Sequence, residues 1–456
     1  MYCGGNRITA WKITMTTTNK IRNIFILAGD VLALYLSLFL ALVIRYGSEF
    51  DRFIGQHLMP FSFLFVPWLL VFYMAGLYDQ GRLRNNMEFL KTLSLAIAVN
   101  AVLAMFFFYL IPYFGITPKT NLLIFLLIFA ALEVTWRRSF NKFTASFQSK
   151  TKIVLVGSGR AAEKISSFVK ENPQLGYKIS IRLKDLSPLK SIADWEKLAS
   201  DNEIDLIVIP RHIKNEPEAS KIFYRLMTFG VRVIDIPAFY EIVFQKIPLD
   251  EVSEEWFLDE IIEKEELYRG FKRIIESVLA LTIFVMLLPL EIIIAILVKL
   301  SSPGQAIYSQ VRVGLNRKEF VIYKFRTMKV NEKHSWPGED DKRITAVGKF
   351  LRRTHLDELP QLLNIIKGDI SFVGPRPDFV DFYKDLEKTI PHYSVRTLVR
   401  PGVTGWAQVN YPITASLEQT KERLAYDLYY IKNHSIALDI AIIAKTIKVL
   451  LTAQGR

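Results

Sequence analysis

The chain contains a single cysteine, Cys3, among 456 residues. One thiol excludes an intramolecular disulfide framework and a metal site built from several cysteines. Histidine is also scarce, with six residues, and His334, His355 and His392 stand apart without the spacing of a zinc site. Cytosolic exposure of the soluble parts is therefore compatible with the composition, and metal ligation by histidine is not expected.

Acidic residues are outnumbered, because 45 Asp and Glu stand against 58 Lys and Arg, giving a formal net charge of +13. Hydrophobic residues make up 51% of the chain and charged residues 23%, a mixture that fits neither a plain soluble protein nor a pure membrane bundle. In a chain with long apolar runs, this charge favours an anionic membrane surface or phosphorylated substrates over nucleic acid. The composition predicts a protein with membrane and soluble parts.

Four apolar runs of membrane-spanning length occupy the first third of the chain. They lie at residues 23–44, 60–77, 89–111 and 121–136. The predicted bundle (20–145) has more basic residues on one side of the membrane than on the other. One side carries Lys20, Arg22, Arg82, Arg84, Lys91, Arg137, Arg138 and Lys142. The other side carries Arg45, Arg52 and Lys119. Because Lys and Arg are enriched in cytoplasmic loops, both ends of the bundle should face the cytoplasm.

Two features of the first run need separate interpretation. Residues 1–19 are polar and without pattern, so we expect an irregular, disordered tail. Asp30 interrupts the run, and a carboxylate in hydrocarbon usually finds a partner or water. It is either a functional intramembrane carboxylate or a residue that reaches the interface or bonds a neighbouring helix; we favour the second interpretation.

Strands and helices alternate from Lys150 to about residue 240. Strands are predicted at residues 152–156, 178–183, 205–210 and 231–236, and helices at 193–200 and 217–229. This order is typical of a Rossmann-like parallel α/β domain.

The first turn of this domain carries a glycine motif. Gly157, Gly159 and Ala162 match the fingerprint G-x-G-x-x-[GA] between a strand and a helix, where a dinucleotide phosphate can bind. The acidic residue expected to hold a ribose is missing, because Arg182 and Lys184 stand at that place. A catalytic dinucleotide and a structural, regulatory or ligand-sensing module both remain open, and we favour the second.

Residues 241–270 are predicted to be a linker whose acidic residues form a solvated face. A fifth apolar run follows at residues 274–300 and contains Pro289. Proline removes a backbone hydrogen bond and bends a helix, so the run is predicted to enter the membrane, turn and leave on the same side. The alternative is a kinked span, which would put the rest of the chain outside.

Residues 271–456 form the predicted catalytic domain, and they are rich in basic and Gly-Pro motifs. The motifs are QVRVG (310–314), YKFRTM (323–328), LRRTHLDELP (351–360), GPRP (374–377) and RPGVTGWAQVN (400–410). Adjacent carboxylates, Asp357 and Glu358, follow two arginines and precede the rigid GPRP. Cations of this kind gather phosphate oxygens, so the pattern indicates phosphate chemistry. We expect a mostly helical cytoplasmic domain in which regular structure is short and local, except for helices near residues 378–388 and 416–431.

In this order and with these gaps, the motifs resemble the bacterial sugar transferase family, the polyprenyl-phosphate glycosyl-1-phosphate transferases that begin exopolysaccharide, capsule and O-antigen repeat units. The resemblance covers about Phe271 to Thr446, and the four spans with an α/β module are similar to the long members. It implies that a hexose 1-phosphate is transferred from a UDP-sugar to undecaprenyl phosphate, with release of UMP. The family leads us to expect glucose or galactose as the sugar and the bacterial inner membrane as the location. The implied partners are UDP-hexose, undecaprenyl phosphate and membrane lipid, without nucleic acid; a homo-oligomer is left open.

The resemblance also implies residue roles. Asp357 corresponds to a covalent nucleophile and Glu358 to a residue that helps to hold Mg²⁺. Lys324, Arg352 and Arg376 correspond to cations that clamp the diphosphate. An aspartyl phosphosugar intermediate and ping-pong kinetics follow from these roles.

Several positions depart from the family pattern or allow two interpretations. His355 stands where a capping serine is common, and Thr354 is expected to take over the cap. Tyr411-Pro412 replaces Gly-Arg, which removes one basic residue. Trp406 and Gln408 either read the uracil or sugar or belong to the core, and we favour the core.

Two other functions fit parts of the sequence. One is a membrane-anchored nucleotide sensor or scaffold with a decayed catalytic part, against which the intact Asp357, Glu358, Lys324 and Arg376 argue. The other is an NAD-dependent enzyme centred on Gly157, against which the missing ribose acid argues.

Overall fold

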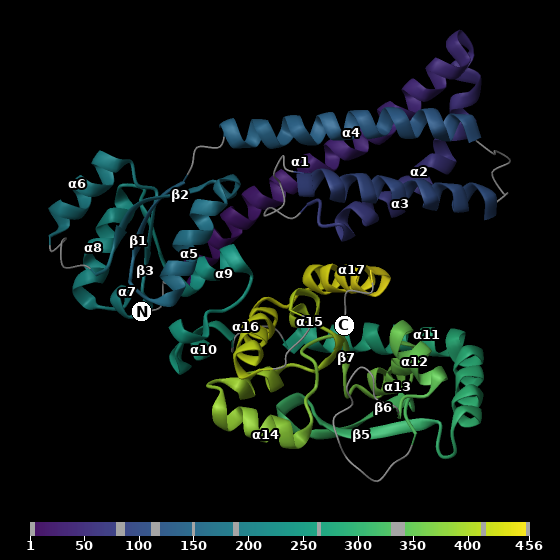
Figure 1. Ribbon diagram of the computed structural model, residues 1–456. Coiled ribbons are helices and arrows are strands. Elements are labelled where there is room, and N and C mark those ends of the chain that lie inside the picture. Colours follow the sequence, from purple (N-terminus) through teal and green to yellow (C-terminus); the bar gives the residue numbers. More distant parts are fainter. Residues whose placement is uncertain are drawn as a thin grey trace. The chain divides into compact units, whose positions relative to one another are not determined.

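The computed structural model describes residues 5–78, 87–110, 119–147, 151–185, 191–261, 266–329, 343–411 and 416–452 (Figure 1). Five residues named in the sequence analysis lie outside these ranges. They are Cys3, Arg82, Arg84, His334 and Pro412. The chain divides into two compact units. The first comprises Met1–Ser158, Ser166–Ile207 and Tyr224–Arg232, and the second comprises Gly159–Ile165, Val208–Phe223 and Val233–Arg456.

Four long helices form the membrane part of the first unit. They are α1 (Gly5–Tyr46), α2 (Phe50–Met74), α3 (Met87–Leu110) and α4 (Lys119–Phe147), with the 3-10 turn η1 (Gly47–Glu49) between the first two. Stretches long and apolar enough to cross a membrane are Ile24–Met74, Phe89–Phe108, Thr120–Lys142 and, in the second unit, Gly270–Ser301. The first stretch contains both α1 and α2, so the structure bears out all four predicted spans as helices.

The start of α1 corrects one expectation. The helix begins at Gly5, whereas residues 1–19 were expected to be irregular. Neither glycine nor proline occurs between Asn6 and Asn19, so nothing in that stretch interrupts a helix that the following apolar run continues.

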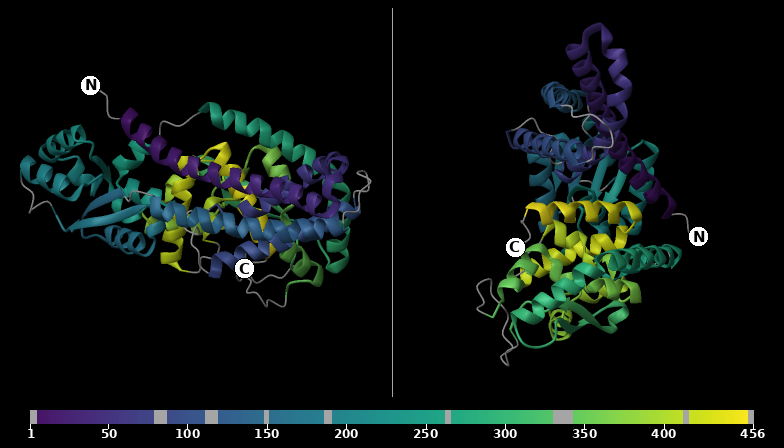
Figure 2. Two further views of the ribbon diagram at one scale, coloured as in Figure 1. Left: turned by 90° about the horizontal axis from the view of Figure 1, so that it is seen from above. Right: turned by 90° about the vertical axis from the view of Figure 1, so that its right-hand side faces the viewer.

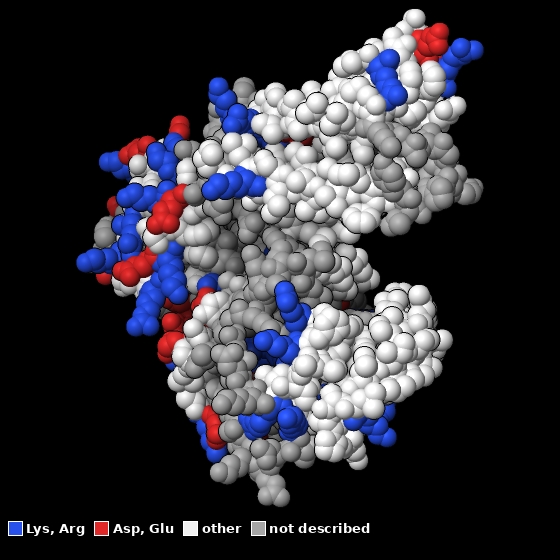
Figure 3. All heavy atoms as spheres, turned by 45° about the vertical axis from the view of Figure 1, so that its right-hand side comes forward, with Lys and Arg blue, Asp and Glu red and all other residues white. Residues whose placement is uncertain are grey.

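The bundle buries aromatic rings and leaves apolar side chains on its surface. Phe125 stacks between Phe65 and Phe129, and all three are almost fully buried. Side chains such as Val66 and Phe106 are more than half exposed, and Figure 3 shows a broad surface without charge on these helices. An uncharged surface of this kind suits contact with hydrocarbon.

A buried ionic cluster joins α1 to α4 inside the bundle. The Arg137 guanidinium pairs with Asp30 at 2.5 Å and with Glu133 at 2.9 Å, and all three side chains are fully buried. Tyr78 Oη and Trp136 Nε1 also donate to Asp30, at 2.6 and 3.2 Å. The interpretation that Asp30 bonds a neighbouring helix is confirmed. Arg137, which was counted among the flanking cations that set orientation, instead lies within the bundle.

The α/β module alternates as predicted. Its elements are β1 (Thr151–Val156), α5 (Arg160–Glu171), η4 (Pro173–Leu175), β2 (Tyr177–Leu183), α6 (Ile192–Asn202), β3 (Leu206–Ile209), α7 (Arg211–Lys214), α8 (Pro217–Thr228) and β4 (Arg232–Asp235). The sheet order is β2-β1-β3-β4, and β1 pairs with β2 in parallel, with Thr151 opposite Tyr177. Every residue of β3 is buried, as is typical of a strand inside a parallel sheet.

The predicted linker is a packed part of the second unit. It contains the end of α9 (Ile236–Phe244), η5 (Leu249–Glu251) and α10 (Glu254–Ile261). Trp256 is 1% exposed and belongs to a core with Leu386 and Leu428. Glu260 pairs with the buried Lys432 at 2.7 Å. The expectation of a solvated acidic face is confirmed for Glu254, Glu255 and Asp259, which are exposed, whereas Glu260 is drawn into a pair with a buried lysine.

The fifth apolar run is one helix, α11 (Glu266–Ser301), with Pro289 inside it. A straight helix of 36 residues would be about 54 Å long. Figures 1 and 2 show instead that α11 turns sharply. Both halves pack on the same domain: Ala280 lies against Leu362 and Ile365, and Val298 lies against Leu351.

The remaining elements of the second unit are short, except for two C-terminal helices. They are β5 (Ile307–Val313), η6 (Leu315–Arg317), β6 (Glu319–Phe325), α12 (Ala346–Thr354), η7 (Leu356–Glu358), α13 (Gln361–Lys367), β7 (Ser371–Val373), α14 (Val380–Thr389), η8 (Tyr393–Leu398), β8 (Gly402–Thr404), α15 (Trp406–Asn410), α16 (Leu417–Asn433) and α17 (Ile436–Thr452). The two helices predicted near residues 378–388 and 416–431 are confirmed as α14 and α16. The antiparallel β5–β6 hairpin was not predicted.

Candidate active site

The two adjacent carboxylates lie on η7, directly after α12. The backbone of His355 has φ 56°, a left-handed conformation that ends α12 and starts the 3-10 turn. The Thr354 hydroxyl donates backward to Phe350 O at 2.9 Å, so the expectation that Thr354 caps the next turn is wrong. A hydroxyl in the last turn of a helix has carbonyl oxygens within reach, and here it bonds one of them.

Lys324 on β6 faces the carboxylates. Its Nζ lies 2.6 Å from Glu358 Oε1, and both side chains are about one-fifth exposed. Alternation along the hairpin strand sets the side on which Lys324 projects. The structure thus joins two of the predicted site residues that are 34 positions apart in the sequence.

The two carboxylates have opposite pKa shifts. Burial raises the pKa of Asp357, and the negative charge of Glu358 raises it further, while Lys324 and His355 oppose these effects. Burial would also raise the pKa of Glu358, but the positive charges of Lys324 and Arg376 outweigh it and lower that pKa. Glu358 is therefore held as an anion, and Asp357 is the more basic of the two.

GPRP is held by close backbone contacts between β7 and β8. Gly374 N donates to Thr404 O at 2.8 Å, and Gly402 N donates to Pro375 O at 2.9 Å. A Cβ atom on Gly374 would overlap the backbone of Arg400 and Gly402, so glycine is required for this approach. The arrangement presents the Arg376 side chain, which is exposed.

Arg396 fixes the backbone on the other side of GPRP. The guanidinium is almost fully buried, donates to Arg376 O at 3.0 Å and pairs with Asp378. Its Nε pairs with Asp427 on α16 at 2.9 Å. These bonds raise the pKa of Arg396 although burial opposes them. Neither Arg396 nor Asp378 was identified from the sequence, where only the position of Asp378 directly after GPRP was a signal.

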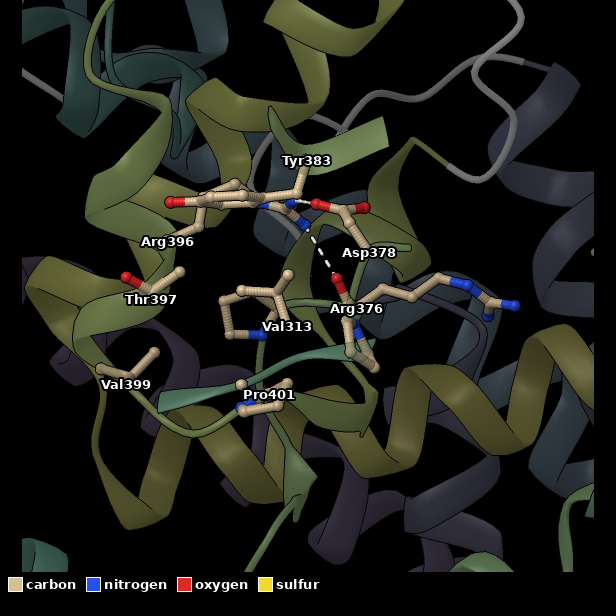
Figure 4. A pocket seen from close by; sticks show the side chains of 11 residues that line it. Val313, Arg376, Asp378, Tyr383, Arg396, Thr397, Val399 and Pro401 are labelled. Carbon is tan, nitrogen blue, oxygen red and sulfur yellow. Dashed lines mark hydrogen bonds and ion pairs between the residues drawn. The ribbon is translucent and has the colours of Figure 1, made fainter. Parts of the chain in front are cut away.

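A small pocket lies behind GPRP, lined by Val313, Asp378, Tyr383 and Arg396 among others. In Figure 4 Arg396 bonds the Arg376 carbonyl and Asp378 across this pocket, while the Arg376 side chain points away from it. The pocket therefore supports the GPRP backbone, and the Arg376 guanidinium acts on its opposite side, where its charge reaches Glu358.

Arg312 on β5 is a further cation beside this site. Its Nη1 donates to Pro377 O at 3.0 Å, and its guanidinium lies 3.4 Å from the centre of the Phe379 ring. Burial lowers its pKa to about 10, and the nearby positive charge of Arg376 contributes. Arg312 stands within the QVRVG motif, but sequence reasoning assigned it no role.

Arg352 is placed differently from the other predicted cations. Its Nε donates to Thr327 Oγ1 at 2.9 Å. Among the described residues, no hydrogen bond or ion pair joins it to Asp357 or Glu358. The structure therefore brings Lys324 and Arg376 to the carboxylates and holds Arg352 against the end of the β6 segment.

Trp406 belongs to the core, and Gln408 bonds the backbone beside it. Trp406 is 4% exposed, and its Nε1 donates to Gln245 O at 2.9 Å. Gln408 Nε2 donates to Val403 O at 3.1 Å. The preferred core interpretation is confirmed for Trp406, whereas Gln408 is half-buried.

The donors of the site suit a magnesium ion that binds together with substrate. No group of three His, Cys, Asp or Glu side chains is gathered for a metal within the described part of the chain. Mg²⁺ commonly uses only one or two carboxylates and takes its other ligands from water and phosphate. Glu358, which the nearby cations hold as an anion, supplies one such carboxylate.

The glycine motif of the α/β module has a carboxylate against it. Gly157 has φ 127°, as only glycine readily adopts, and Ala162 is fully buried. A Cβ on Gly159 would lie 2.7 Å from the Glu251 carboxylate of η5. Glu251 thus lies close to the start of α5, where an incoming phosphate would meet a negative charge.

Comparison with known proteins places the chain in a family. A profile described as "Bacterial sugar transferase" matches residues 267–453. A UDP-N-acetylgalactosamine-undecaprenyl-phosphate N-acetylgalactosaminephosphotransferase of Aeromonas hydrophila is 43% identical over 195 residues, 41% of this chain and 45% of that protein. A UDP-glucose:undecaprenyl-phosphate glucose-1-phosphate transferase of Xanthomonas campestris pv. campestris is 32% identical over 317 residues, 65% of each chain.

The alignment to a third relative spans nearly the whole chain. A UDP-glucose:undecaprenyl-phosphate glucose-1-phosphate transferase of Klebsiella pneumoniae is 30% identical over 434 residues, 89% of this chain and 92% of that protein. This chain covers less than two thirds of the length of the first two relatives. Its alignment to the Klebsiella pneumoniae protein is long enough to include the membrane helices and the α/β module. The chain therefore belongs to the bacterial sugar transferase family of polyprenyl-phosphate sugar-phosphate transferases.

Proposed function

We propose that the protein transfers a sugar 1-phosphate from a UDP-sugar to undecaprenyl phosphate, giving undecaprenyl-diphosphate-sugar and UMP. The observation that carries the proposal is the Lys324–Glu358 pair beside Asp357, within the part that matches the family. The relatives' names include both glucose and N-acetylgalactosamine transfer. The sugar is therefore left to experiment, and a hexose 1-phosphate is the expectation.

The reaction proceeds in two displacements at one phosphorus. An oxygen of Asp357 attacks the phosphorus attached to the sugar, a P–O bond to Asp357 forms, and the P–O bond to UMP breaks. An oxygen of the lipid phosphate then attacks the same phosphorus and releases the Asp357 carboxylate. Burial and the neighbouring Glu358 raise the pKa of Asp357, which makes its carboxylate a better nucleophile once ionised.

Cations reduce the repulsion between the anionic reactants. Lys324 and Arg376 stand beside the carboxylates, where their charges favour binding of phosphate oxygens before attack. When bound at Glu358, Mg²⁺ would neutralise further phosphate charge. Lys324 fixes the orientation of Glu358 through its ion pair, so that the carboxylate is already in place when the substrate arrives.

The geometry of α11 supports a re-entrant hairpin. Lys272 near its start pairs with Asp439 at 2.6 Å. Arg326 donates to Ser302 O at 2.6 Å and to Pro303 O at 2.9 Å, just after the helix ends. Because both ends are bonded to one domain, the hairpin would enter and leave on one membrane face. The distribution of flanking basic residues favours the cytoplasmic face, where UDP-sugars occur.

The test uses membranes that contain the protein, undecaprenyl phosphate, Mg²⁺ and a panel of UDP-sugars, with UMP release as the measurement. We expect release with at least one sugar and loss of release in Asp357→Asn. Radiolabelled sugar should remain on the protein when the lipid is left out. If no UDP-sugar gives UMP release, the proposal is refuted and a membrane-anchored sensor or scaffold is favoured. Unchanged release by Asp357→Asn would exclude the covalent route.

A further inference from the structure

The second glycine of the α/β fingerprint, Gly159, lies against a carboxylate of the same chain. In a dinucleotide-binding turn, the glycine at this place lets the backbone approach the pyrophosphate. A Cβ on Gly159 would lie 2.7 Å from Glu251 Oε1, and apart from the adjacent residues this carboxylate is the only group of the described chain within 4 Å of that Cβ. Glu251 therefore takes the space that a pyrophosphate would need.

An ion pair holds the same part of the chain beside the neighbouring strand. Arg211 follows β3 as Gly159 follows β1, and these two strands are adjacent in the sheet. Arg211 Nη2 pairs with Asp259 of α10 at 2.5 Å. The sheet continues from β1 to β2 on one side and from β3 to β4 on the other, and open α/β sheets bind their ligands where the order reverses in this way. Residues 236–261, here called the docking segment, thus contact both loops that would hold such a ligand.

The docking segment is also bonded to α16. Ile247 N donates to Ala425 O at 3.0 Å. Near the end of the helix, the buried Lys432 pairs with Glu241 at 2.9 Å and with Glu260 at 2.7 Å. All of these residues, together with Gly159 and Arg211, belong to the second unit. The segment therefore connects the α/β module to a helix of the catalytic part.

We propose that the α/β module is a docking surface for residues 236–261 and not a dinucleotide site, with the Glu251 carboxylate in the place of the pyrophosphate. An anion suits this place, because the start of a helix carries a positive partial charge. Through the docking segment the module supports α16, whose Asp427 pairs with Arg396, the residue that bonds the Arg376 carbonyl. Neither the docking nor its tests depend on the transferase function proposed above.

The first test is a double-mutant cycle on the melting temperature of the full-length protein in detergent. Gly159→Ala should lower the melting temperature by about 2–4 °C, because its Cβ overlaps the Glu251 carboxylate. In the Glu251→Ala background the same change should cost nothing, since the overlapping group is gone. Asp250→Ala removes the exposed neighbouring carboxylate and is the matched control, which should leave the cost of Gly159→Ala unchanged. An equal effect of Gly159→Ala in all three backgrounds would overturn the inference.

The second test asks whether a nucleotide binds at the turn. NADH fluorescence titration and equilibrium dialysis with ADP, both with the full-length protein, should show no saturable binding in the presence of excess UDP. UDP is included to occupy the candidate active site, so that binding there is not counted. Saturable binding of NADH or ADP that resists UDP and is lost in Gly157→Val would place a nucleotide at the turn and refute the proposed role of Glu251.

The third test measures the support of α16 by hydrogen exchange. Glu251→Ala should raise the exchange rate of peptides from residues 417–433 about 3- to 10-fold, because the docking segment that bonds α16 is loosened. Peptides from α12 serve as the internal reference and should exchange as in the unmodified protein, and Asp250→Ala should leave both regions unchanged. If α16 exchanges at the same rate in Glu251→Ala and in the unmodified protein, the module does not support α16 through this contact.

Discussion

Two buried arginines, Arg137 in the membrane bundle and Arg396 in the second unit, are paired in the same way. Each contacts two carboxylates and a backbone carbonyl oxygen, Leu77 O for Arg137 and Arg376 O for Arg396. They differ in their surroundings. Tyrosine and tryptophan side chains complete the cluster around Arg137. Arg423, which has buried nitrogen atoms without a hydrogen-bond partner, borders the same hollow as Arg396.

The comparison separates two uses of buried charge. In the bundle, one guanidinium is shared by two carboxylates, and the cluster joins α1 to α4. Beside the proposed nucleophile Asp357, by contrast, Arg376 has no acidic partner among the described residues, and we expect an anionic ligand to pair with it. The following predictions test whether that difference is real.

The largest effect is expected from Arg137→Met, which leaves Asp30 and Glu133 buried without a cation. Breaking a buried pair typically costs about 3–5 kcal/mol, so the variant should melt far earlier or fail to accumulate in membranes. Thermal unfolding in detergent is the measurement. Lys142→Met, on the exposed side of the same helix, is the control and should behave like the unmodified protein. Equal melting temperatures for the two variants would contradict a structural role for the cluster.

Arg396→Met should also cost about 3–5 kcal/mol, because Asp378 and Asp427 lose their shared cation. Activity should fall together with stability, since the same side chain holds the Arg376 backbone. Arg396→Lys restores the charge but only part of the bonding, and should recover stability in part. Arg317→Met removes an exposed partner of Glu387 and serves as the control. A stable but inactive Arg396→Met would show that Arg396 is needed in catalysis and not for the fold.

The pH dependence of the first displacement tests the carboxylate pair. Asp357 attacks only when ionised, and burial and Glu358 raise its pKa, so the rate should fall as the pH drops through that raised value. Lys324 lowers the pKa of Asp357. Lys324→Gln should therefore move the acid limb of the kcat profile to higher pH, besides slowing the reaction. Lys318→Gln, an exposed cation in the turn of the same hairpin, should leave the limb in place. Movement toward lower pH would refute the assignment.

The smallest effect on stability is expected from Arg376→Gln. The side chain is exposed and lacks an ion-pair partner in the described part of the protein, so the free energy of unfolding should change by no more than about 0.5 kcal/mol. UMP release should nevertheless fall strongly. Destabilisation as large as that of Arg396→Met would mean that Arg376 belongs to the structural cluster, and the distinction between the two clusters would fail.

Much of the fold could be predicted because local signals were strong. The bundle helices follow from uninterrupted apolar runs, and the strands of the α/β module follow from short buried runs such as Leu206–Ile209. The linker was predicted only in part. Its residues Glu254, Glu255 and Asp259 are exposed as expected, but Glu241 and Glu260 pair with Lys432, which lies far along the chain.

The sequence by itself determined the membrane helices and the family, and it selected Asp357, Glu358, Lys324 and Arg376 as candidate site residues, since each depends on residue type and spacing along the chain. The tertiary structure alone decided which charges are matched. From the sequence, Arg137 was grouped with the basic residues that flank the membrane spans, but in the fold it is a buried ion-pair partner of Asp30. Arg396 and Arg423 look alike in the sequence, yet one pairs with two aspartates and the other has no acidic partner among the described residues. Ion pairing depends on distances between residues remote in sequence, which only the folded chain sets.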